Sequence, residues 1–306
     1  MELKEFMEKV KNGVCAFLGE DTKVELKAVV KNNGVVLQGM IIIREDAAVA
    51  PTIYLDSFFE DYKEGKSLGT IVREICTIYE QNRIKEKINF DFFLDYRAVR
   101  TRIFQKIINY EQNKNRLENI PHVRFLDMAV VCYYAYMNDF LGKGSVQIDT
   151  SHLDMWGISQ EDLFRDAREN TMYKLGLEIK RMDEIVGEML LDNLDGVNPK
   201  QIEDVMQGTI QSVPMYVMTL RGRYFGAVCI CFEEWLQSFA DSIGKNLYIL
   251  PSSIHELILI PDRGKEEPDF LRNMVQEVNA EHVSAEEILS DNIYYFNRSD
   301  KSVSLV

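Results

Sequence analysis

Residues 248–261 read YILPSSIHELILIP, in which two apolar runs flank a short polar turn. The first run ends at Pro251, and the second, residues 257–260, is wholly apolar and ends before Pro261. Short apolar runs bounded by turn residues are typical of strands that are buried on both faces. The stretch therefore predicts two buried strands joined by a turn.

The turn carries Ser253, His255 and Glu256, the side-chain types of a serine hydrolase, so these three residues are the catalytic candidates. On a strand, however, Ser253 and His255 share one face while Glu256 points away, and the chain has no G-x-S-x-G motif. The favoured interpretation is a cap, in which Ser253 accepts from the N–H of Glu256 and the Glu256 carboxylate reaches back to the serine N–H. The zinc-protease pattern HExxH fails because Leu259 replaces its second histidine.

Outward from this stretch, helical and strand patterns are mixed without a regular βαβ rhythm. A helix is predicted at residues 3–18, a hairpin across Asn33-Gly34, and further helices that begin at Ser67 and Ser159. Four more segments are predicted from their patterns: helices at 97–117 and 183–208, a hairpin turn at 142–145, and a second hairpin at 216–232.

These patterns predict an α+β fold with mostly antiparallel hairpins and two lobes. Pro121 interrupts the helical pattern, and the chain beyond it is rich in branched and aromatic residues. The predicted domains are an N-terminal helix, hairpin and helical lobe at 1–120 and a C-terminal α+β lobe at 121–306.

The composition predicts a cytoplasmic globular protein that does not cross a membrane. The chain has 306 residues, 46% of them hydrophobic and 27% charged, which is enough apolar material for a substantial core. The charged N-terminal residues do not form a secretion signal, and the longest apolar run, residues 128–137, is half the roughly 20 residues that a membrane helix needs. Five scattered cysteines fit a reducing compartment.

A net charge of -14 argues against nucleic acid as a partner, because such affinity comes mostly from lysine and arginine. Residues 83–124 are a local exception, with five acidic residues and ten basic ones, at positions 83, 85, 87, 97, 100, 102, 106, 114, 116 and 124. This asymmetry is compatible with an anionic partner or with an acidic face of the same protein. The favoured interpretation is the solvated side of a helix.

No metal or cofactor is predicted. Cys229 and Cys231 would share one face of a strand, but a closed zinc site needs a second ligand pair, so buried thiols are favoured. The sequence GKS at 65–67 resembles the end of a phosphate loop, yet Glu60 occupies a required glycine position. Ser67 is therefore read as a helix N-cap.

Trp156, Asn170 and Tyr248 are the candidate binding residues. Trp156 precedes a predicted helix cap, where a tryptophan packs as a staple in the core or, if exposed, anchors an interface; the core is favoured. The many tyrosines and phenylalanines of the chain are suited to lining a groove.

Segments distributed over nearly the whole chain resemble a family of uncharacterised proteins, a domain of unknown function encoded by anaerobic gut Firmicutes. They are PTIYLDSFFEDYKEGKS, INYEQNKN, IPHVRFLDMAVV, HLDMWGISQEDLFRDARENT, PMYVMT, YFGAVCI and LYILPSSIHELILIP. The resemblance implies no activity and no catalytic residue.

Two classes of function stay open: a cytosolic non-catalytic binding or interaction protein with a protein partner, which is favoured, and a hydrolase that uses His255 with a serine or carboxylate partner. An imidazole in an open pocket, with a carboxylate on one ring nitrogen and a hydroxyl on the other, would favour the enzyme. A buried or backbone-bonded imidazole would favour the binding protein.

Overall fold

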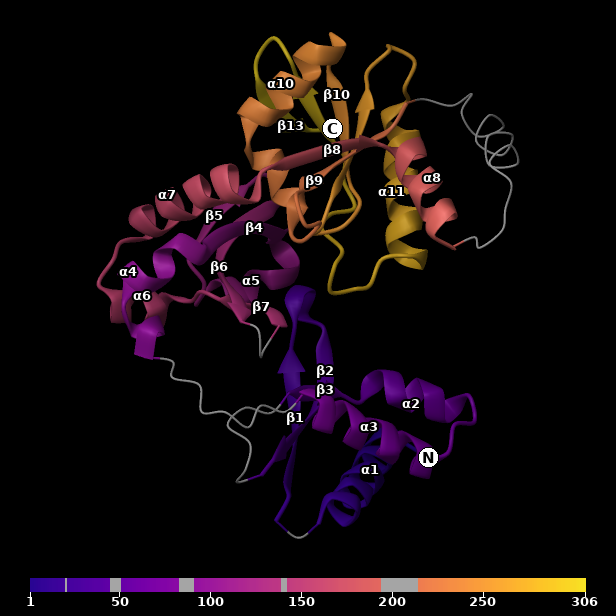
Figure 1. Ribbon diagram of the computed structural model, residues 1–306. Helices are drawn as coiled ribbons and strands as arrows, with labels where there is room; N and C mark the ends of the chain where they lie inside the picture. Colours follow the sequence, from indigo (N-terminus) through magenta and orange to yellow (C-terminus); the bar gives the residue numbers. More distant parts are fainter. Residues whose placement is uncertain (20, 45–50, 83–90, 139–141, 194–213) are drawn as a thin grey trace. The chain divides into compact units, whose positions relative to one another are not determined.

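The computed structural model describes residues 1–306 except 20, 45–50, 83–90, 139–141 and 194–213 (Figure 1). The chain separates into two compact units by its contacts. The first unit comprises Met1–Asp95 and Tyr136–Ser145, and the second comprises Tyr96–Ala135 and Val146–Val306. This division differs from the lobe boundary predicted at residue 120, because residues 96–120 pack with the second unit.

The first unit packs helices on a three-stranded sheet of order β1-β2-β3. The side chains of Phe6, Val10 and Val14 form one stripe of α1 and are fully buried in a core shared with α3 and the sheet. The hairpin between β1 and β2 turns at Asn33, whose φ is 58°, which confirms the predicted Asn-Gly turn. Its elements are α1 (Leu3–Leu18), β1 (Lys23–Val30), η1 (Asn32–Gly34), β2 (Val36–Ile43), β3 (Thr52–Tyr54), α2 (Asp56–Lys63), α3 (Leu68–Asn82) and η2 (Asp91–Leu94).

The second unit is built on a six-stranded sheet of order β13-β12-β10-β11-β9-β8. The two strands predicted from YILPSSIHELILIP are confirmed as β10 and β11, which pair antiparallel near the middle of this sheet. The strands are β8 (Leu177–Arg181), β9 (Tyr216–Leu220), β10 (Leu247–Pro251), β11 (Leu257–Pro261), β12 (Tyr294–Asn297) and β13 (Ser302–Leu305).

A further sheet contains β4, β6 and β5 in that order, with β7 paired to β6; the end of β6 from residue 136 and the start of β7 up to residue 145 are counted with the first unit. Its strands are β4 (Ile103–Asn109), β5 (His122–Phe125), β6 (Met128–Asn138) and β7 (Gly142–Gln147). The helices and short helical turns around the two sheets are α4 (Tyr96–Val99), η3 (Arg100–Arg102), η4 (Glu111–Asn113), α5 (Lys114–Leu117), α6 (Thr150–Trp156), α7 (Gln160–Asn170), η5 (Thr171–Leu175), α8 (Met182–Asn193), η6 (Gly226–Cys231), α10 (Glu233–Ile243) and α11 (Pro268–Glu281).

Helices α10 and α11 lie against opposite faces of the six-stranded sheet (Figure 1). Ile249 packs in one core cluster with Leu236 of α10, whereas its neighbour Leu250 packs in another cluster with Leu271 of α11. This follows from the two-residue period of a strand, which sends successive side chains to opposite faces. Covered on both faces, β10 is buried along its whole length.

The α+β class with mostly antiparallel strands is confirmed, but three local predictions are wrong. Residues 103–109 form β4 within the segment predicted as a helix, and residues 142–145 belong to β7 rather than to a turn. Residues 226–231 form the helical turn η6, so the predicted second hairpin does not exist and Cys229 and Cys231 do not share a strand face.

Several predicted helices are confirmed. Ser159 caps α7 by accepting from the N–H of Asp162, and Ser67 accepts from the N–H of Thr70 at the start of α3. The region predicted as a helix at 183–208 begins as α8, and residues 194–208 lie outside the described part of the chain. Within the described residues, every helix is too short or too polar to cross a membrane.

The turn between β5 and β6 is tied to the C-terminal part of the second unit through Asp127. Its carboxylate accepts hydrogen bonds from Ser290 Oγ at 2.7 Å, Asn292 Nδ2 at 3.0 Å and the Tyr294 hydroxyl at 2.7 Å. Three donors satisfy most of the acceptor sites of one carboxylate. A residue at a sheet turn is thus held by three residues that lie more than 160 positions later in the chain.

Candidate functional site

The polar turn between β10 and β11 is closed by its own backbone and by Ser253. The Ser253 hydroxyl accepts a hydrogen bond from the N–H of His255 at 3.0 Å, and the Ser253 N–H donates to the carbonyl of Glu256 at 3.5 Å. The predicted cap is therefore wrong in detail, because the serine accepts from two residues on rather than three. This is the hydroxyl turn that serine forms locally with its own backbone.

The His255 ring is engaged on both nitrogens. Nδ1 accepts the backbone N–H of Phe225 at 3.1 Å, and Nε2 lies 3.4 Å from Glu287 Oε1. Since a backbone N–H is always a donor, Nδ1 presents its lone pair, and the network assigns the ring hydrogen to Nε2, toward Glu287. The side chain is 24% exposed and stacks on the Phe225 ring with an interplanar angle of 8°.

Phe225 holds an unusual backbone conformation beside this imidazole. Its φ of 56° and ψ of 28° are left-handed, a region that costs a residue with a side chain roughly 1–2 kcal/mol. The hydrogen bond to His255 and the ring stack offset that cost. Gly226 follows, and a Cβ there would collide with Thr219 Oγ1 and with the carbonyl oxygen of His255. The chain therefore passes closely over the turn at 253–256.

The side chains of Lys106, Tyr133 and Tyr224 contact Phe225, and the charge of Arg116 acts on Lys106; we call these five residues the basic-aromatic cluster. Helical turn η6 packs against β4, which brings Lys106 to the Phe225 ring. Lys106 Nζ lies 4.5 Å from the centre of that ring and 5.8 Å from the centre of the Tyr133 ring. The Phe225 ring also contacts the rings of Tyr133 and Tyr224, at 4.9 and 3.9 Å between centroids.

The electrostatics of this cluster are those of a partly dehydrated cation. Burial, reinforced by the positive charge of Arg116, lowers the pKa of Lys106 to about 8. Burial likewise lowers the pKa of Arg116 and raises that of the Tyr133 hydroxyl. Among the residues that the structure describes, no carboxylate forms an ion pair with Lys106 or Arg116.

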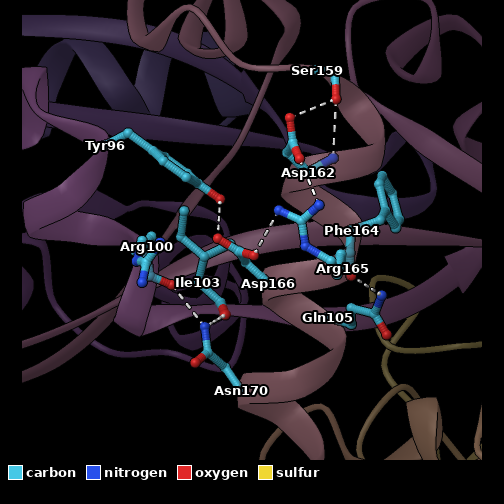
Figure 2. Close-up of polar contacts among 10 residues, drawn as sticks. All are labelled: Tyr96, Arg100, Ile103, Gln105, Ser159, Asp162, Phe164, Arg165, Asp166 and Asn170. Atoms are coloured by element: carbon cyan, nitrogen blue, oxygen red, sulfur yellow. Dashed lines mark hydrogen bonds and ion pairs between the residues drawn. The ribbon is translucent and has the colours of Figure 1, made fainter.

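The predicted binding residue Asn170 lies in a polar network along α7 (Figure 2). Its Nδ2 donates to the carbonyls of Arg100 at 2.7 Å and Ile103 at 3.0 Å, and its side chain is buried. Figure 2 also shows the Tyr96 hydroxyl donating to Asp166, which in turn contacts Arg165. Since the Asn170 amide nitrogen donates both of its hydrogens to backbone carbonyls, its role is to hold the start of β4 in place.

The other two binding candidates are core residues elsewhere in the second unit. Trp156 is 9% exposed and contacts the rings of Tyr96 and His152, with centroids 5.6 and 5.5 Å away, as the core interpretation predicts. Tyr248, also buried, packs edge to face on Tyr295 in the core cluster that contains α11. The contacts of Trp156, Asn170 and Tyr248 therefore do not converge on one site.

Lys106 and Arg116 were counted in the basic stretch but assigned to the solvated side of a helix, and for Lys106 the strand assignment makes this wrong. Glu287 and Phe225 were not candidates. The only signal in the sequence was YFG at 224–226, where an aromatic residue precedes a glycine after the turn RGR. The residues that contact the His255 ring come from two distant segments, at 224–225 and 287, which spacing along the chain does not reveal.

A family model described as a family of unknown function (DUF5688) matches residues 3–298. Neither the curated proteins nor the solved structures contain a match to the chain.

Proposed function

We propose, from the premise that the chain belongs to the DUF5688 family, that it is a non-catalytic binding or interaction protein. The family carries no activity from which residue roles could be transferred, so the proposal rests on local geometry. The observation that carries it is the hydrogen bond from the Phe225 N–H to His255 Nδ1.

A serine hydrolase needs one imidazole nitrogen at the nucleophilic hydroxyl and the other at an acid. His255 has an acid, Glu287, at Nε2, but its other nitrogen meets a backbone N–H instead of a hydroxyl. Ser253, the nearest serine in sequence, uses its oxygen to accept from the amide of His255 itself. The Ser253 hydroxyl thus closes its own turn, and the His255 ring ties that turn to Phe225, which favours a structural role for His255.

The hydrolase remains the second candidate because of one contact, His255 Nε2 to Glu287 Oε1 at 3.4 Å. An imidazole and a carboxylate at a partly exposed position are two of the three members of a triad. Catalysis by this pair would require the Phe225 N–H to release Nδ1, or a substrate to approach Nε2 in place of Glu287.

The partner and location are part of the same proposal. We propose a protein as the partner, and neither nucleic acid nor a membrane. The net charge of -14 supports this for nucleic acid, because such affinity comes mostly from lysine and arginine. The five cysteines are free thiols, which supports a reducing cytoplasm as the location. An origin in anaerobic gut Firmicutes is also proposed, from the sequence resemblance described above.

The test compares Ser253→Ala, His255→Ala and Glu287→Gln with the unaltered protein in an ester and peptide hydrolysis screen and in thermal melts. Ser252→Ala is the matched control, because no hydrogen bond of the Ser252 side chain is present among the described contacts. We expect no turnover by any form, and a loss of roughly 0.5–2 kcal/mol for Ser253→Ala with a smaller loss for Ser252→Ala. Turnover by the unaltered protein that a stably folded His255→Ala variant lacks would support the hydrolase instead.

A further inference from the structure

Among the residues that the structure describes, Lys106 of the second unit has no carboxylate as counterion. It lies in β4 between buried neighbours, Gln105 and Ile107, and its own side chain is only partly exposed. Its charge contacts the faces of Phe225 and Tyr133 but no carboxylate of the described residues. A cation over an aromatic face is stabilised by about 0.5–2 kcal/mol, which is far less than the cost of removing an unpaired charge from water.

Arg116, the second cation of the cluster, also has no carboxylate partner among the described residues. Arg116 of α5 donates from Nη1 to the side-chain oxygen of Asn113, a neutral group, and its remaining donors have no carboxylate among the described contacts. Its charge is close enough to Lys106 to act on it. Two partly dehydrated cations that repel each other, in a protein of net charge -14, form a local site of positive potential.

Hydroxyl groups complete the surroundings. The Tyr133 side chain is buried, and its hydroxyl makes no hydrogen bond among the described residues. Tyr224, whose ring packs on Phe225, is 51% exposed, so the cluster reaches the surface at this residue. The Tyr133 hydroxyl oxygen is not fully enclosed by protein, so this donor is available to a group that approaches from the surface.

We propose that the basic-aromatic cluster binds the oxyanion group, carboxylate or phosphate, of a small molecule, with Lys106 and Arg116 as its charge partners and Tyr133 and Tyr224 as hydrogen-bond donors. Such a group supplies the negative charge and the acceptor oxygens that the cluster lacks, and ammonium, guanidinium and phenol groups all donate to oxyanions. This proposal rests on the proposed binding function and names the ligand class for it.

The chain itself argues against an acidic side chain of its own as the occupant. Glu287, the acid that meets His255, does not reach Lys106 within ion-pair distance. Glu178 and Glu188 are both paired with Arg223, and Glu188 with Lys180 as well. Glu178, Glu188 and Glu287 thus have other partners, and Glu256 forms no ion pair with Lys106 or Arg116 among the described residues, so the two cations are left for a ligand.

The experiment measures the ionisation of Lys106 directly. Lysines of the full chain are labelled by reductive methylation with ¹³C, which keeps their charge, and the Lys106 signal is identified by its absence from a Lys106→Met variant. Inorganic phosphate and acetate are titrated separately at constant ionic strength. We expect the pKa of Lys106 to rise from about 8 when the anion that fits is added, because a negative charge stabilises the ammonium form.

A thermal shift with the same two anions provides the second readout. The unaltered protein is expected to melt at a higher temperature in the anion that binds, and Lys106→Met is expected to lose that increase. Lys114→Met is the control: it removes the same charge two positions from Arg116, but from a side chain that is 65% exposed and paired with Glu111, and it should keep the increase.

The proposal would be overturned if the ¹³C signal of Lys106 responded to neither anion, or if the anion raised the melting temperature of Lys106→Met as much as that of the unaltered protein. It would also be overturned if Lys106→Met and Lys114→Met lost this rise in melting temperature equally, which would mean general charge screening. A response to phosphate alone identifies a phosphate-bearing ligand, and a response to acetate alone a carboxylate. These results are separate from the hydrolysis screen, so a protein that binds anions and also hydrolyses esters would overturn the non-catalytic function alone.

Discussion

Lys106→Met is expected to stabilise the protein at neutral pH, although it removes a charged residue from a net-acidic chain. The methionine side chain keeps the length of the lysine stem and fills the space between Phe225 and Tyr133 without a charge. The variant therefore removes the cost of dehydrating an unpaired ammonium while it keeps most of the packing.

The size of the gain follows from the pKa. Burial lowers the pKa of Lys106 from 10.5 to about 8. A difference of one in pKa corresponds to about 1.4 kcal/mol, so the folded protein destabilises the charged form by roughly 3 kcal/mol relative to the unfolded chain. The variant also loses the contacts of the cation with two aromatic rings, about 1–2 kcal/mol. The expected net gain is about 1–2 kcal/mol, or roughly 2–8 °C in melting temperature for a domain of 150–250 residues.

The gain should depend on pH in one direction. Between about 8 and 10.5 the unfolded chain holds the Lys106 proton and the folded protein does not, so the stability of the unaltered protein rises with pH in that window. The advantage of Lys106→Met should therefore be complete below pH 8 and fade toward pH 10.5.

Urea unfolding in Tris chloride, without phosphate or carboxylate buffers, measures this difference across the pH range. Lys114→Met again serves as the control and should change the unfolding free energy by less than about 0.5 kcal/mol, because the side chain is exposed. A Lys106→Met protein that is less stable than the unaltered one at pH 7, or whose advantage does not fade at high pH, would refute the reasoning.

Three further outcomes are expected. Gly226→Ala should destabilise the protein by more than 2 kcal/mol in denaturant unfolding, because the new Cβ meets the backbone of the turn at His255, whereas Gly69→Ala, which has open space in α3, should be neutral or stabilising. Partial burial alone would raise the pKa of Glu266, but the N–H groups of Arg263 and Lys265 and the Arg263 side chain hold it down to about 2; in urea unfolding Glu266→Gln should destabilise the protein at pH 7, and progressively less as the pH falls from 4.5 toward 2. In native-state alkylation followed by mass spectrometry, Cys15 should react first, because burial raises the pKa of the other thiols, those of Cys76, Cys132, Cys229 and Cys231.

The centre of the second unit could be predicted because its signals are local. The runs of β10 and β11 are short, apolar and bounded by prolines, and the Asn33-Gly34 turn of the first unit needs only two residues to specify it. Strand β4 was assigned to a helix for a physical reason. Residues 103, 104, 107 and 108 are all buried, and this spacing matches one helical face as well as a strand covered on both sides.

Much of the candidate site could not be predicted because it depends on tertiary contacts. The sequence AVCIC has the composition of a strand, yet the left-handed Phe225 and the close approach at Gly226 set it into a helical turn. The dehydration of Lys106 arises only when η6 packs on β4, and nothing in the residues beside it indicates that burial. His255 was found from sequence, but its partners Phe225 and Glu287 lie about 30 residues away on either side.

The anchoring of Asp127 has a consequence for the synthesis of the chain. Its three donors, Ser290, Asn292 and Tyr294, leave the ribosome more than 160 residues after the carboxylate does, and Tyr294 also begins β12. Until then the nascent chain exposes an acidic turn and the open edge of β10, to which β12 pairs. Exposed strand edges can pair with strands of other chains. Before residues 290–294 emerge from the ribosome, the chain is therefore at its greatest risk of aggregation, and a chaperone would be most useful then.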